Sequence, residues 1–281
     1  MKKGYLFEEL TWHEVNDAVR GAKVAVVPVG MIEDHGAHLP VDTDAKIAEA
    51  VCHAAAERIP EEVVVLPTVK YAYSPHHMDF PGTVSVPPLG MSRNWGVLVE
   101  YLSSITCSLA HQGFTKILIV NGHGSNRPLI DLAGRVTILE YPNAQCGSIS
   151  WWEIESVQEA FEKVLESSVS SHAGEVETSL YLAIDPDLVY MDRAERDLTF
   201  NASKHFWSNL ISRKPGPNYR NPVHMNDFWS MDTENGVKGD PTVASKEKGV
   251  KILEAAAEEL AEIIKEFRAR EIGKRKNHLS R

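Results

Sequence analysis

The chain has 281 residues, of which 43% are hydrophobic and 24% are charged, and its formal net charge is −10. These fractions are typical of a globular protein and exclude an intrinsically disordered one. The negative charge argues against a nucleic-acid binder and against docking on an anionic membrane, because both need a basic face. No apolar run approaches the roughly 20 residues of a membrane span, and the N-terminus lacks the pattern of a signal peptide. The three cysteines are far apart, which suits a reduced compartment, so we expect a cytoplasmic protein.

Short β-branched runs alternate with helical patterns along the chain. The expected strands are 23–28, 61–69, 115–120 and 144–150. The expected helices are 44–59, 90–112, a stretch from 127, 153–166, 175–183 and an amphipathic helix over about 242–270. This alternation predicts an α/β protein with a single domain over residues 1–281, a three-layer α/β/α sandwich with a mainly parallel central sheet.

Three details complete this assignment. Thr43 or Asp44 is the expected N-cap of the first long helix. Residues 71–88 are rich in proline, glycine and aromatic residues and are expected to form a structured loop. Residues 200–240 have a similar composition, and we expect them to form an excursion over the surface or an oligomer contact.

Acidic and imidazole side chains follow the first expected strand, in the segment GMIEDHGAHLPVDTD. Glu33 and His35 are two residues apart, so their side chains point the same way in an extended segment. Asp44 begins the next expected helix and can face back toward them. Carboxylate and imidazole ligands together suit zinc, manganese or iron. The alternative is a solvated acidic turn beside the strand.

A second polar motif, NGHGSN, directly follows the third expected strand. Glycines flank His123, so the backbone can bend sharply there and carry the imidazole to the edge of the sheet. Open α/β sheets bind ligands outside the carboxyl ends of their strands, where this histidine falls. One alternative is a turn that caps the next helix at Ser125 or Asn126. Another is a phosphate cradle, which the lack of Lys or Arg within the loop disfavours.

Two further segments carry side chains that can bind a substrate or move a proton. The loop SPHHMDFPGT has adjacent histidines, His76 and His77, which either hydrogen-bond a substrate or are simply solvated. In SHAGEVETS, His172 precedes an expected helix whose first turn holds Glu175 and Glu177. A proton-transfer histidine beside a carboxylate is one explanation of this pattern. Acidic residues that interact with the helix dipole are the other.

The four motifs together resemble those of the creatininase family, also called the creatinine amidohydrolase family. Its members carry motifs like G-x-x-E-x-H-G-x-H-L-P-x-x-T-D, S-x-x-H-x-x-F-P-G-T, N-G-H-G-x-N and H-A-G-E-x-E-T-S. All four are present here in one order, and the resemblance runs from about residue 7 to about residue 265. The resemblance implies one three-layer domain in a homo-oligomer, often a hexamer, with one or two divalent metal ions.

The resemblance also implies roles for individual residues. The positions that match metal ligands are Glu33, His35, Asp44 and His123. Asp44 matches a carboxylate that can bridge two metals, and His172 matches a histidine near the reacting group. His77 matches a substrate contact, and we expect Ser125 and Trp152 to contact the substrate as well.

Two departures from the family pattern bear on the chemistry. Asp34 stands where the family usually has Gln, which alters the hydrogen bonding around the ligands. Creatinine-cleaving members read N-G-H-Y-E-N, and their Glu ligates a second metal, whereas this chain has Gly124 and Ser125 there. We therefore expect the second metal to use Glu175, with a catalytic role beside His172, or to be weakly held. This difference favours a family member other than true creatininase.

We expect a metal-dependent hydrolase in which metal-activated water attacks a small cyclic amide or formamide and breaks a C–N bond. His172 would donate or relay a proton to the leaving group. One alternative is ring opening of a cyclic keto-polyol such as a diketo-inositol, which breaks a C–C bond. Others are a non-catalytic metal-containing binding protein and a phosphate or nucleotide binding module. The expected cofactor is one or two ions of zinc, manganese or iron.

Overall fold

A four-stranded parallel sheet forms the centre of the computed structural model, with the strand order β2-β1-β3-β4. The model describes residues 3–90, 96–199, 203, 205–207, 209–211, 223, 226–276 and 278–279. The sheet consists of β1 Val24–Val29, β2 Val63–Val65, β3 Lys116–Asn121 and β4 Gln145–Ser150. The α-helices of the described residues are α1 Trp12–Arg20, α2 Thr43–Arg58, α3 Gly96–Gln112, α4 Arg127–Glu140, α5 Glu155–Val164, α6 Glu175–Ile184 and α7 Lys246–Ala269.

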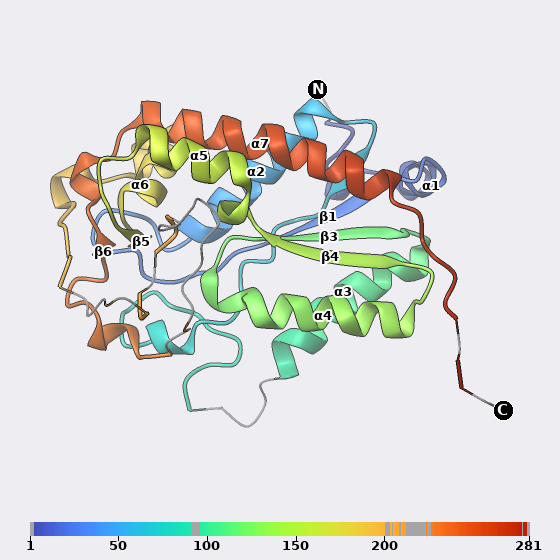
Figure 1. Ribbon diagram of the computed structural model, residues 1–281, viewed down its shortest axis with the longest axis horizontal. Coiled ribbons are helices and arrows are strands. Elements are labelled where there is room, and N and C mark those ends of the chain that lie inside the picture. Colours follow the sequence, from blue (N-terminus) through green and yellow to red (C-terminus); the bar gives the residue numbers. More distant parts are fainter. Residues whose placement is uncertain are drawn as a thin grey trace.

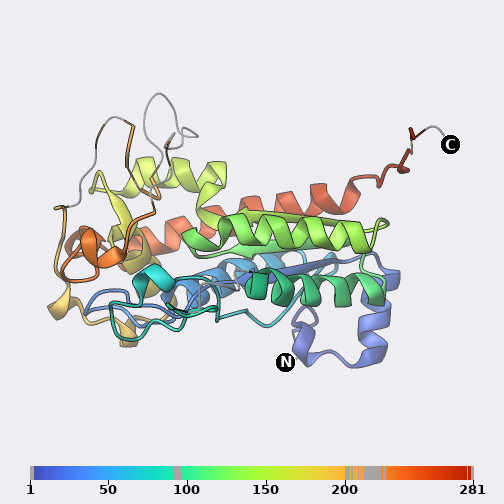
Figure 2. The same cartoon turned by 90° about the horizontal axis from the view of Figure 1, so that it is seen from below.

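Alternate side chains of the strands enter two separate cores, because successive residues of a strand point to opposite faces. Val24 and Val26 of β1 pack in a core with residues of α2, α5, α6 and α7. Ala25 and Val27 pack in the other core, with residues of α1, α3 and α4. Figure 1 shows α7 above the sheet and α3 and α4 below it, and Figure 2 shows the same layers from below. The expected three-layer α/β/α fold with a parallel sheet is confirmed.

Two glycines let α2 approach the ends of β1 and β3. A Cβ on Gly30 would lie 2.3 Å from the Cα of Ala45, and a Cβ on Gly122 would lie 2.5 Å from the carbonyl oxygen of Asp44. The first turn of α2 therefore rests on the carboxyl ends of two neighbouring strands, at positions that leave no room for a side chain. Here the connections from β1 and β3 leave toward opposite edges of the sheet, which is the point where open α/β sheets bind ligands.

The start of α2 differs from the expectation. Asp42, and neither Thr43 nor Asp44, is the N-cap residue. The hydroxyl of Thr43 instead donates a 2.6 Å hydrogen bond back to the carbonyl oxygen of Pro40. The carboxylate of Asp44 does not cap the helix and instead faces His35 and His123 beyond the helix end.

A second, antiparallel sheet was not expected from the sequence. It pairs β5 Ser170–His172 with β6 Lys238–Gly239. With three and two residues, these strands are too short to produce a hydrophobic pattern. β6 lies inside the segment 200–240, so part of that segment returns to the body of the protein beside His172.

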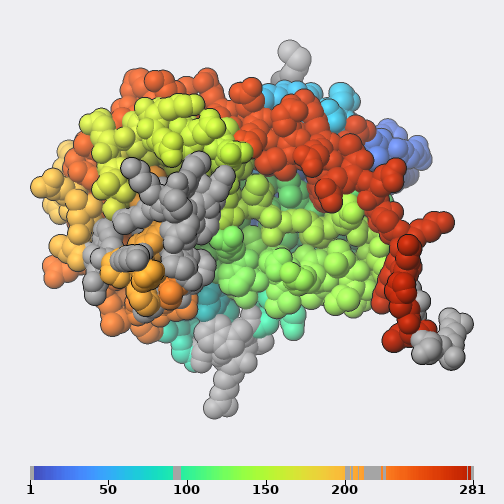
Figure 3. Space-filling view, viewed as in Figure 1, coloured from blue at the N-terminus to red at the C-terminus, as the bar shows by residue number. Residues whose placement is uncertain are grey.

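The two ends of the described chain lie far from each other along the molecule (Figures 1 and 2). In Figure 3 the residues that follow α7, in red, run along one end of the molecule away from its body. Among the helices of the described residues, none is long and apolar enough to cross a membrane. The helix expected over about 242–270 is α7, which covers one face of the sheet.

Candidate metal centre and active site

Carboxylate and imidazole side chains from three segments converge at the carboxyl ends of β1 and β3. Glu33 and His35 come from the loop after β1, Asp44 from the first turn of α2, and His123 directly follows β3. Nδ1 of His123 lies 3.2 Å from Oε1 of Glu33 and 2.9 Å from Oδ2 of Asp44. Nε2 of His35 lies 3.3 Å from Oδ1 of Asp44. The structure thus brings together four of the five side chains that were expected to bind metal, and Glu175 is the exception.

The spacing of these atoms fits a divalent cation. Two ligand atoms that each lie about 2.1 Å from one metal ion are about 3.0–3.4 Å apart, close to the distances found here. Both carboxylate oxygens of Glu33 and Nε2 of His35 are buried and make no hydrogen bond with other described residues. Buried polar atoms are normally paired. A cation between them would supply the partner that these atoms lack.

The charges around the cluster also fit a cation. Burial disfavours protonation of His35, but the charge of Asp44, its contact with the ring, and the charges of Glu177 and Glu33 together raise the pKa of His35 to about 10. Burial likewise opposes protonation of His123, and the charge of Glu33 with the contact to Asp44 holds its pKa well above the ordinary value. Two imidazoles that keep protons at neutral pH indicate a strongly negative environment. A divalent metal would replace these protons, because ligating imidazoles are neutral.

Backbone carbonyl groups set the orientation of two histidine rings. Nδ1 of His35 lies 3.2 Å from the carbonyl oxygen of Glu33, and Nε2 of His172 lies 2.7 Å from the carbonyl oxygen of Asp34. A carbonyl oxygen can only accept, so in each case the facing nitrogen carries the hydrogen and donates it. Nδ1 of His172 is therefore free to bind a metal or accept a proton, and Nε2 of His35 becomes able to bind a metal once a cation has displaced its proton.

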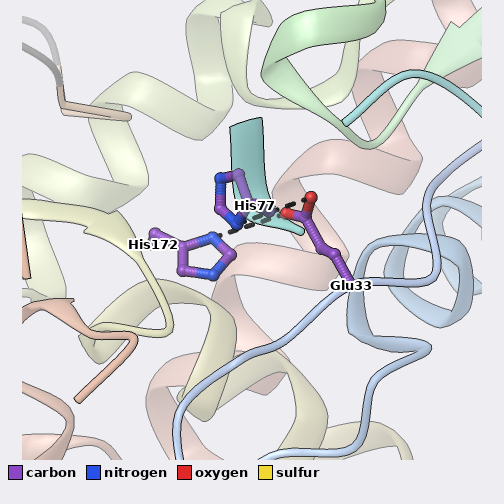
Figure 4. A group of neighbouring side chains, drawn as sticks. All are labelled: Glu33, His77 and His172. Atoms are coloured by element: carbon purple, nitrogen blue, oxygen red, sulfur yellow. Dashed lines mark ion pairs between the residues drawn. The ribbon is translucent and has the colours of Figure 1, made fainter. Parts of the chain in front are cut away.

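His77 and His172 lie beside the first cluster and face Glu33 (Figure 4). Nδ1 of His77 is 3.7 Å from Oε2 of Glu33, and Nδ1 of His172 is 3.6 Å from Oε1. Burial, followed by the charge of the neighbouring His172, lowers the pKa of His77 well below the ordinary value. Burial, followed by the charge of His35, does the same for the pKa of His172. Both rings are therefore neutral at pH 7 and can accept a proton or a ligand.

Asp34 lies behind His77. Its Oδ1 is 3.2 Å from Nδ1 of His77, and it also faces the hydroxyl of Thr83 at 3.4 Å. Burial, with the charge of Glu33 adding to it, raises the pKa of Asp34 to about 7. The residue that replaces the usual Gln therefore contacts a histidine of the site, and its backbone carbonyl orients another, His172.

The structure corrects the expectation that Glu175 is a metal ligand and a catalytic residue. Glu175 is fully buried, and its carboxylate forms a 2.6 Å ion pair with Lys248 of α7. It also accepts hydrogen bonds from the backbone N–H groups of Glu166 and Ser167, at 3.0 and 2.7 Å. These partners occupy the carboxylate and hold it away from the metal cluster. Glu175 therefore connects α6 to α7.

Glu177 faces the cluster in its place. Its Oε2 accepts a 2.6 Å hydrogen bond from the backbone N–H of Ala173. Together with His35 and His172 it offers three donor atoms that all lie within 4.8 Å of one another. Burial raises the pKa of Glu177 to about 7. Helical residues two positions apart point about 200° away from each other, so only one of the two glutamates can face His172, and this spacing was the available sequence signal.

A cavity of about 1360 Å³ opens over these side chains. Glu33, Asp44 and His123 lie among the residues that line it. The three residues expected to contact a substrate line the same cavity; they are His77, Ser125 and Trp152. The metal donors and the expected substrate contacts therefore line one cavity. Oγ of Ser125 lies 3.1 Å from Nε2 of His76, at hydrogen-bond distance.

Trp229, on the 3-10 helix Trp229–Met231, belongs to the site although the sequence did not predict it there. Its indole stacks on the ring of His77, with centroids 4.5 Å apart and planes 15° apart. It also meets the ring of His172 edge-on at 5.0 Å. The enrichment of aromatic residues in 200–240 was the only sign of this contact, because it joins segments that are distant in the chain.

Comparisons with known proteins place this chain among hydrolases. The creatininase family model, described as creatinine amidohydrolase, matches residues 8–264. A mycofactocin precursor peptide peptidase of Mycolicibacterium smegmatis is 32% identical over 249 residues, which cover 87% of this chain and 85% of the relative. A creatinine amidohydrolase of Pseudomonas putida is 30% identical over 289 residues, which cover 95% of this chain and 98% of the relative.

Relatives with other activities match as well. A 3-dehydro-scyllo-inosose hydrolase of Thermotoga maritima is 25% identical, covering 95% of this chain and 85% of the relative. A 2-amino-5-formylamino-6-ribosylaminopyrimidin-4(3H)-one 5'-monophosphate deformylase of Methanocaldococcus infernus is 31% identical. That match covers only 37% of this chain and 42% of the relative. Family membership therefore does not by itself select a substrate.

Solved structures agree with the sequence comparisons. A creatininase crystal structure matches with a TM-score of 0.75 and 28% identity, covering 95% of this chain and 99% of its own. A manganese creatininase and a zinc–zinc creatininase mutant each match with a TM-score of 0.74 and 27% identity, covering 93% and 95% of this chain and 98% of their own. The fold, the motifs and the matched length lead to one conclusion: this chain belongs to the creatininase family of hydrolases.

Proposed function

We propose that this protein is a metal-dependent amidohydrolase that breaks the C–N bond of a cyclic amide or a formamide. The proposal is carried by the buried donors Glu33, His35, Asp44 and His123, which we call the floor of the cavity. A divalent cation would satisfy those of their atoms that make no hydrogen bond. When bound, such a cation lowers the pKa of a water molecule toward 7 and polarises a carbonyl group. The zinc and manganese forms of related creatininases support one or two such ions here.

Asp44 is suited to serve two ions, because its two oxygens face different histidines. Oδ2 faces His123, and Oδ1 faces His35. Glu33 and His123 would complete a first position with Asp44. His35 and Glu177 would complete a second one, so Glu177 makes a second ion possible without a carboxylate in the loop after β3.

His172 is the residue that we assign to proton transfer. Its Nε2 donates to the carbonyl oxygen of Asp34, so the lone pair of the neutral ring is on Nδ1, toward Glu33. Nδ1 can take up a proton at the floor of the cavity and release it to the leaving nitrogen. The ring is only 6% exposed, and Trp229 packs against it, so bulk water is kept from this proton.

The volume of the cavity supports a second candidate substrate, a peptide amide. Pockets for drug-sized ligands usually measure about 300–1000 Å³, and this cavity measures about 1360 Å³. A Cβ on Gly124 would meet nothing within 4 Å, so there is open space beside His123. The mycobacterial relative is named as a peptidase of a precursor peptide, which supports the same candidate.

Cleavage of a C–C bond in a cyclic keto-polyol remains the alternative reaction at the same donors, and the inosose hydrolase relative supports it. A metal-containing binding protein without turnover is the non-enzymatic alternative. We further propose that residues 1–281 form one creatininase-like domain, which the span of the family model supports. A small-molecule substrate, assembly into a homo-oligomer and a cytoplasmic location remain predictions.

The test is metal content per chain by elemental mass spectrometry, followed by assays with the metal found. The substrates are creatinine, hydantoin, N-formyl amino acids, short peptides and a diketo-inositol. We expect close to two metals per chain and fewer in Glu177→Gln. We also expect hydrolysis of an amide, seen as ring opening of a cyclic amide, as formate and an amine from a formamide, or as a free amine from a peptide. Full metal loading with no hydrolysis of any amide would overturn the proposal, and turnover of the diketo-inositol alone would establish the alternative reaction.

A further inference from the structure

Lys238 is a buried cation in the wall of the cavity that neither metal binding nor proton transfer requires. Its side chain is 6% exposed, whereas that of Arg127, the one other lysine or arginine of the described lining, is 51% exposed. Lysine is rarely buried so completely, because its ammonium loses hydration and its long chain loses rotamer freedom. A buried ammonium in a ligand cavity is therefore a candidate for ligand recognition.

The position of Lys238 places it close to the reacting groups. It belongs to β6 and lies opposite His172 in the antiparallel pairing with β5. Its Nζ is 5.1 Å from the ring centroid of Trp229, and that ring in turn contacts His77 and His172. One aromatic ring thus separates the ammonium from the histidines of the site.

The wall around Lys238 offers hydrogen-bond donors. An ammonium group can only donate, and the indole N–H of Trp229 is buried without a hydrogen-bond partner among the described residues. Asp232 accepts a hydrogen bond from this ammonium, with its Oδ2 2.7 Å from Nζ. The side chain of Asp232 is 26% exposed, so it can turn toward solvent when another acceptor arrives. Donors and positive charge on a wall suit an oxyanion on the ligand.

We propose that Lys238, Trp229 and Asp232 form an oxyanion subsite that selects substrates with a carboxylate or a phosphate near the scissile amide. The ligand oxyanion replaces the carboxylate of Asp232 at the ammonium. A lysine acts as a point charge and does not impose the fork geometry of arginine, so it accepts either oxyanion. This inference rests on the proposed function for the identity of the bond that is broken. The preference for an oxyanion is argued only from the residues of the cavity wall.

Matched substrates test the subsite on the metal-loaded protein. N-formylglycine and N-formylglycinamide differ only in the carboxylate, as do hydantoin-5-acetic acid and hydantoin-5-acetamide. We expect wild type to prefer the acid of a pair by at least about 10-fold in kcat/KM, mainly through KM. In Lys238→Met this preference should vanish, while the neutral amide is cleaved within about twofold of wild type. Lys238→Arg should keep part of the preference, and Lys163→Met, an exposed lysine of α5, should change nothing.

A binding measurement separates this inference from the proposed reaction. If no amide is cleaved, calorimetry with N-formylglycine and N-formylglycinamide decides, and tighter binding of the acid that disappears in Lys238→Met supports the subsite alone. Acetate and inorganic phosphate as competitors identify the preferred oxyanion, and only competition lost in Lys238→Met counts, because both anions also bind metals. Equal binding of acid and amide by wild type, or a preference unchanged in a folded Lys238→Met with full metal content, overturns the subsite.

Discussion

The floor and the wall of the cavity are built in different ways. The floor consists of side chains that immediately follow β1 and β3 or begin α2, and they sit on a parallel sheet covered on both faces. The wall that carries Trp229 and Lys238 comes from late segments joined through the short pair β5–β6. The floor is acidic, whereas this wall is aromatic and offers donors. Most of the proposed metal donors and the proposed oxyanion subsite therefore lie in separate parts of the chain, and substitutions in each should have different effects.

The largest expected effect is on the floor. His123→Ala or Asp44→Ala removes a donor that faces other donors at 2.9–3.3 Å. We expect loss of metal and a drop in turnover of about 1000-fold or more, because metal activation is worth several kcal/mol. Elemental analysis and an amidase assay check both. His111→Ala, an exposed histidine of α3, is the control, and full metal content in His123→Ala would contradict the assigned floor.

The next effect separates proton transfer from metal binding. His172→Gln removes the unprotonated Nδ1 that faces Glu33. We expect kcat to fall by about 10²–10⁴-fold, the usual contribution of a general acid or base, while metal content stays at the wild-type level. If the metal is lost with the activity, His172 belongs to the ligands of the floor.

The two glutamates of α6 have different expected roles, because Glu177 faces the metal donors whereas Glu175 stabilises the packing of α6 on α7. Glu175→Gln leaves the mostly buried Lys248 without its fully buried partner. We expect the free energy of unfolding to fall by about 2–3 kcal/mol, since broken buried pairs are costly, with metal content unchanged. Urea denaturation measures this loss. Glu159→Gln, an exposed residue of α5, is the control and should stay within about 0.5 kcal/mol.

The metal-free floor should respond to pH. In the folded chain burial opposes the charge on His35, but Asp44, Glu177 and Glu33 together raise its pKa from 6.5 to about 10. The folded state therefore holds a proton that the unfolded chain releases. The stability from this group is complete below about pH 6.5 and is lost as pH rises toward 10. We expect the Tm of metal-free protein to fall by about 5 °C between pH 7 and 9. The Tm of metal-loaded protein should change less over the same pH range. Equal slopes of Tm against pH in the two forms would contradict the replacement of these protons by a cation.

The smallest expected effect is on the rim of the cavity. Ser125→Ala removes the hydroxyl that contacts His76. We expect KM to rise about 3–10-fold, the value of one hydrogen bond, with kcat and metal content unchanged. Ser108→Ala, exposed on α3, serves as control. A large fall in kcat would move Ser125 from substrate binding to the chemistry of the floor.

The floor was accessible to sequence analysis because its donors are local to motifs that follow strands. Glu33, His35 and His123 lie within a few residues of strand ends, and the carboxyl ends of parallel strands share one edge. The layered fold followed from the alternation of buried strands and helices, since both faces of the sheet are covered. Local patterns thus carried both the fold class and the ligands.

The residues of the cavity wall could not be predicted from such local sequence patterns. Trp229 reaches His77, and Lys238 reaches the neighbourhood of His172, through a pairing in which β6 has two residues. No periodicity exists over so short a strand. The choice between Glu175 and Glu177 failed for a related reason, because the partner that withdraws Glu175 lies on α7, far along the chain. Contacts between distant segments decided each of these residues.

The ion pair between Glu175 and Lys248 also sets an order of events during synthesis. α6 carries Glu177, and α7, the helix that anchors α6, follows it in the chain and leaves a ribosome after it. A nascent chain that ends before Lys246 already contains every proposed metal donor but lacks this anchor. Stable metal capture should therefore follow translation of α7, a helix that supports the site although it contributes no ligand.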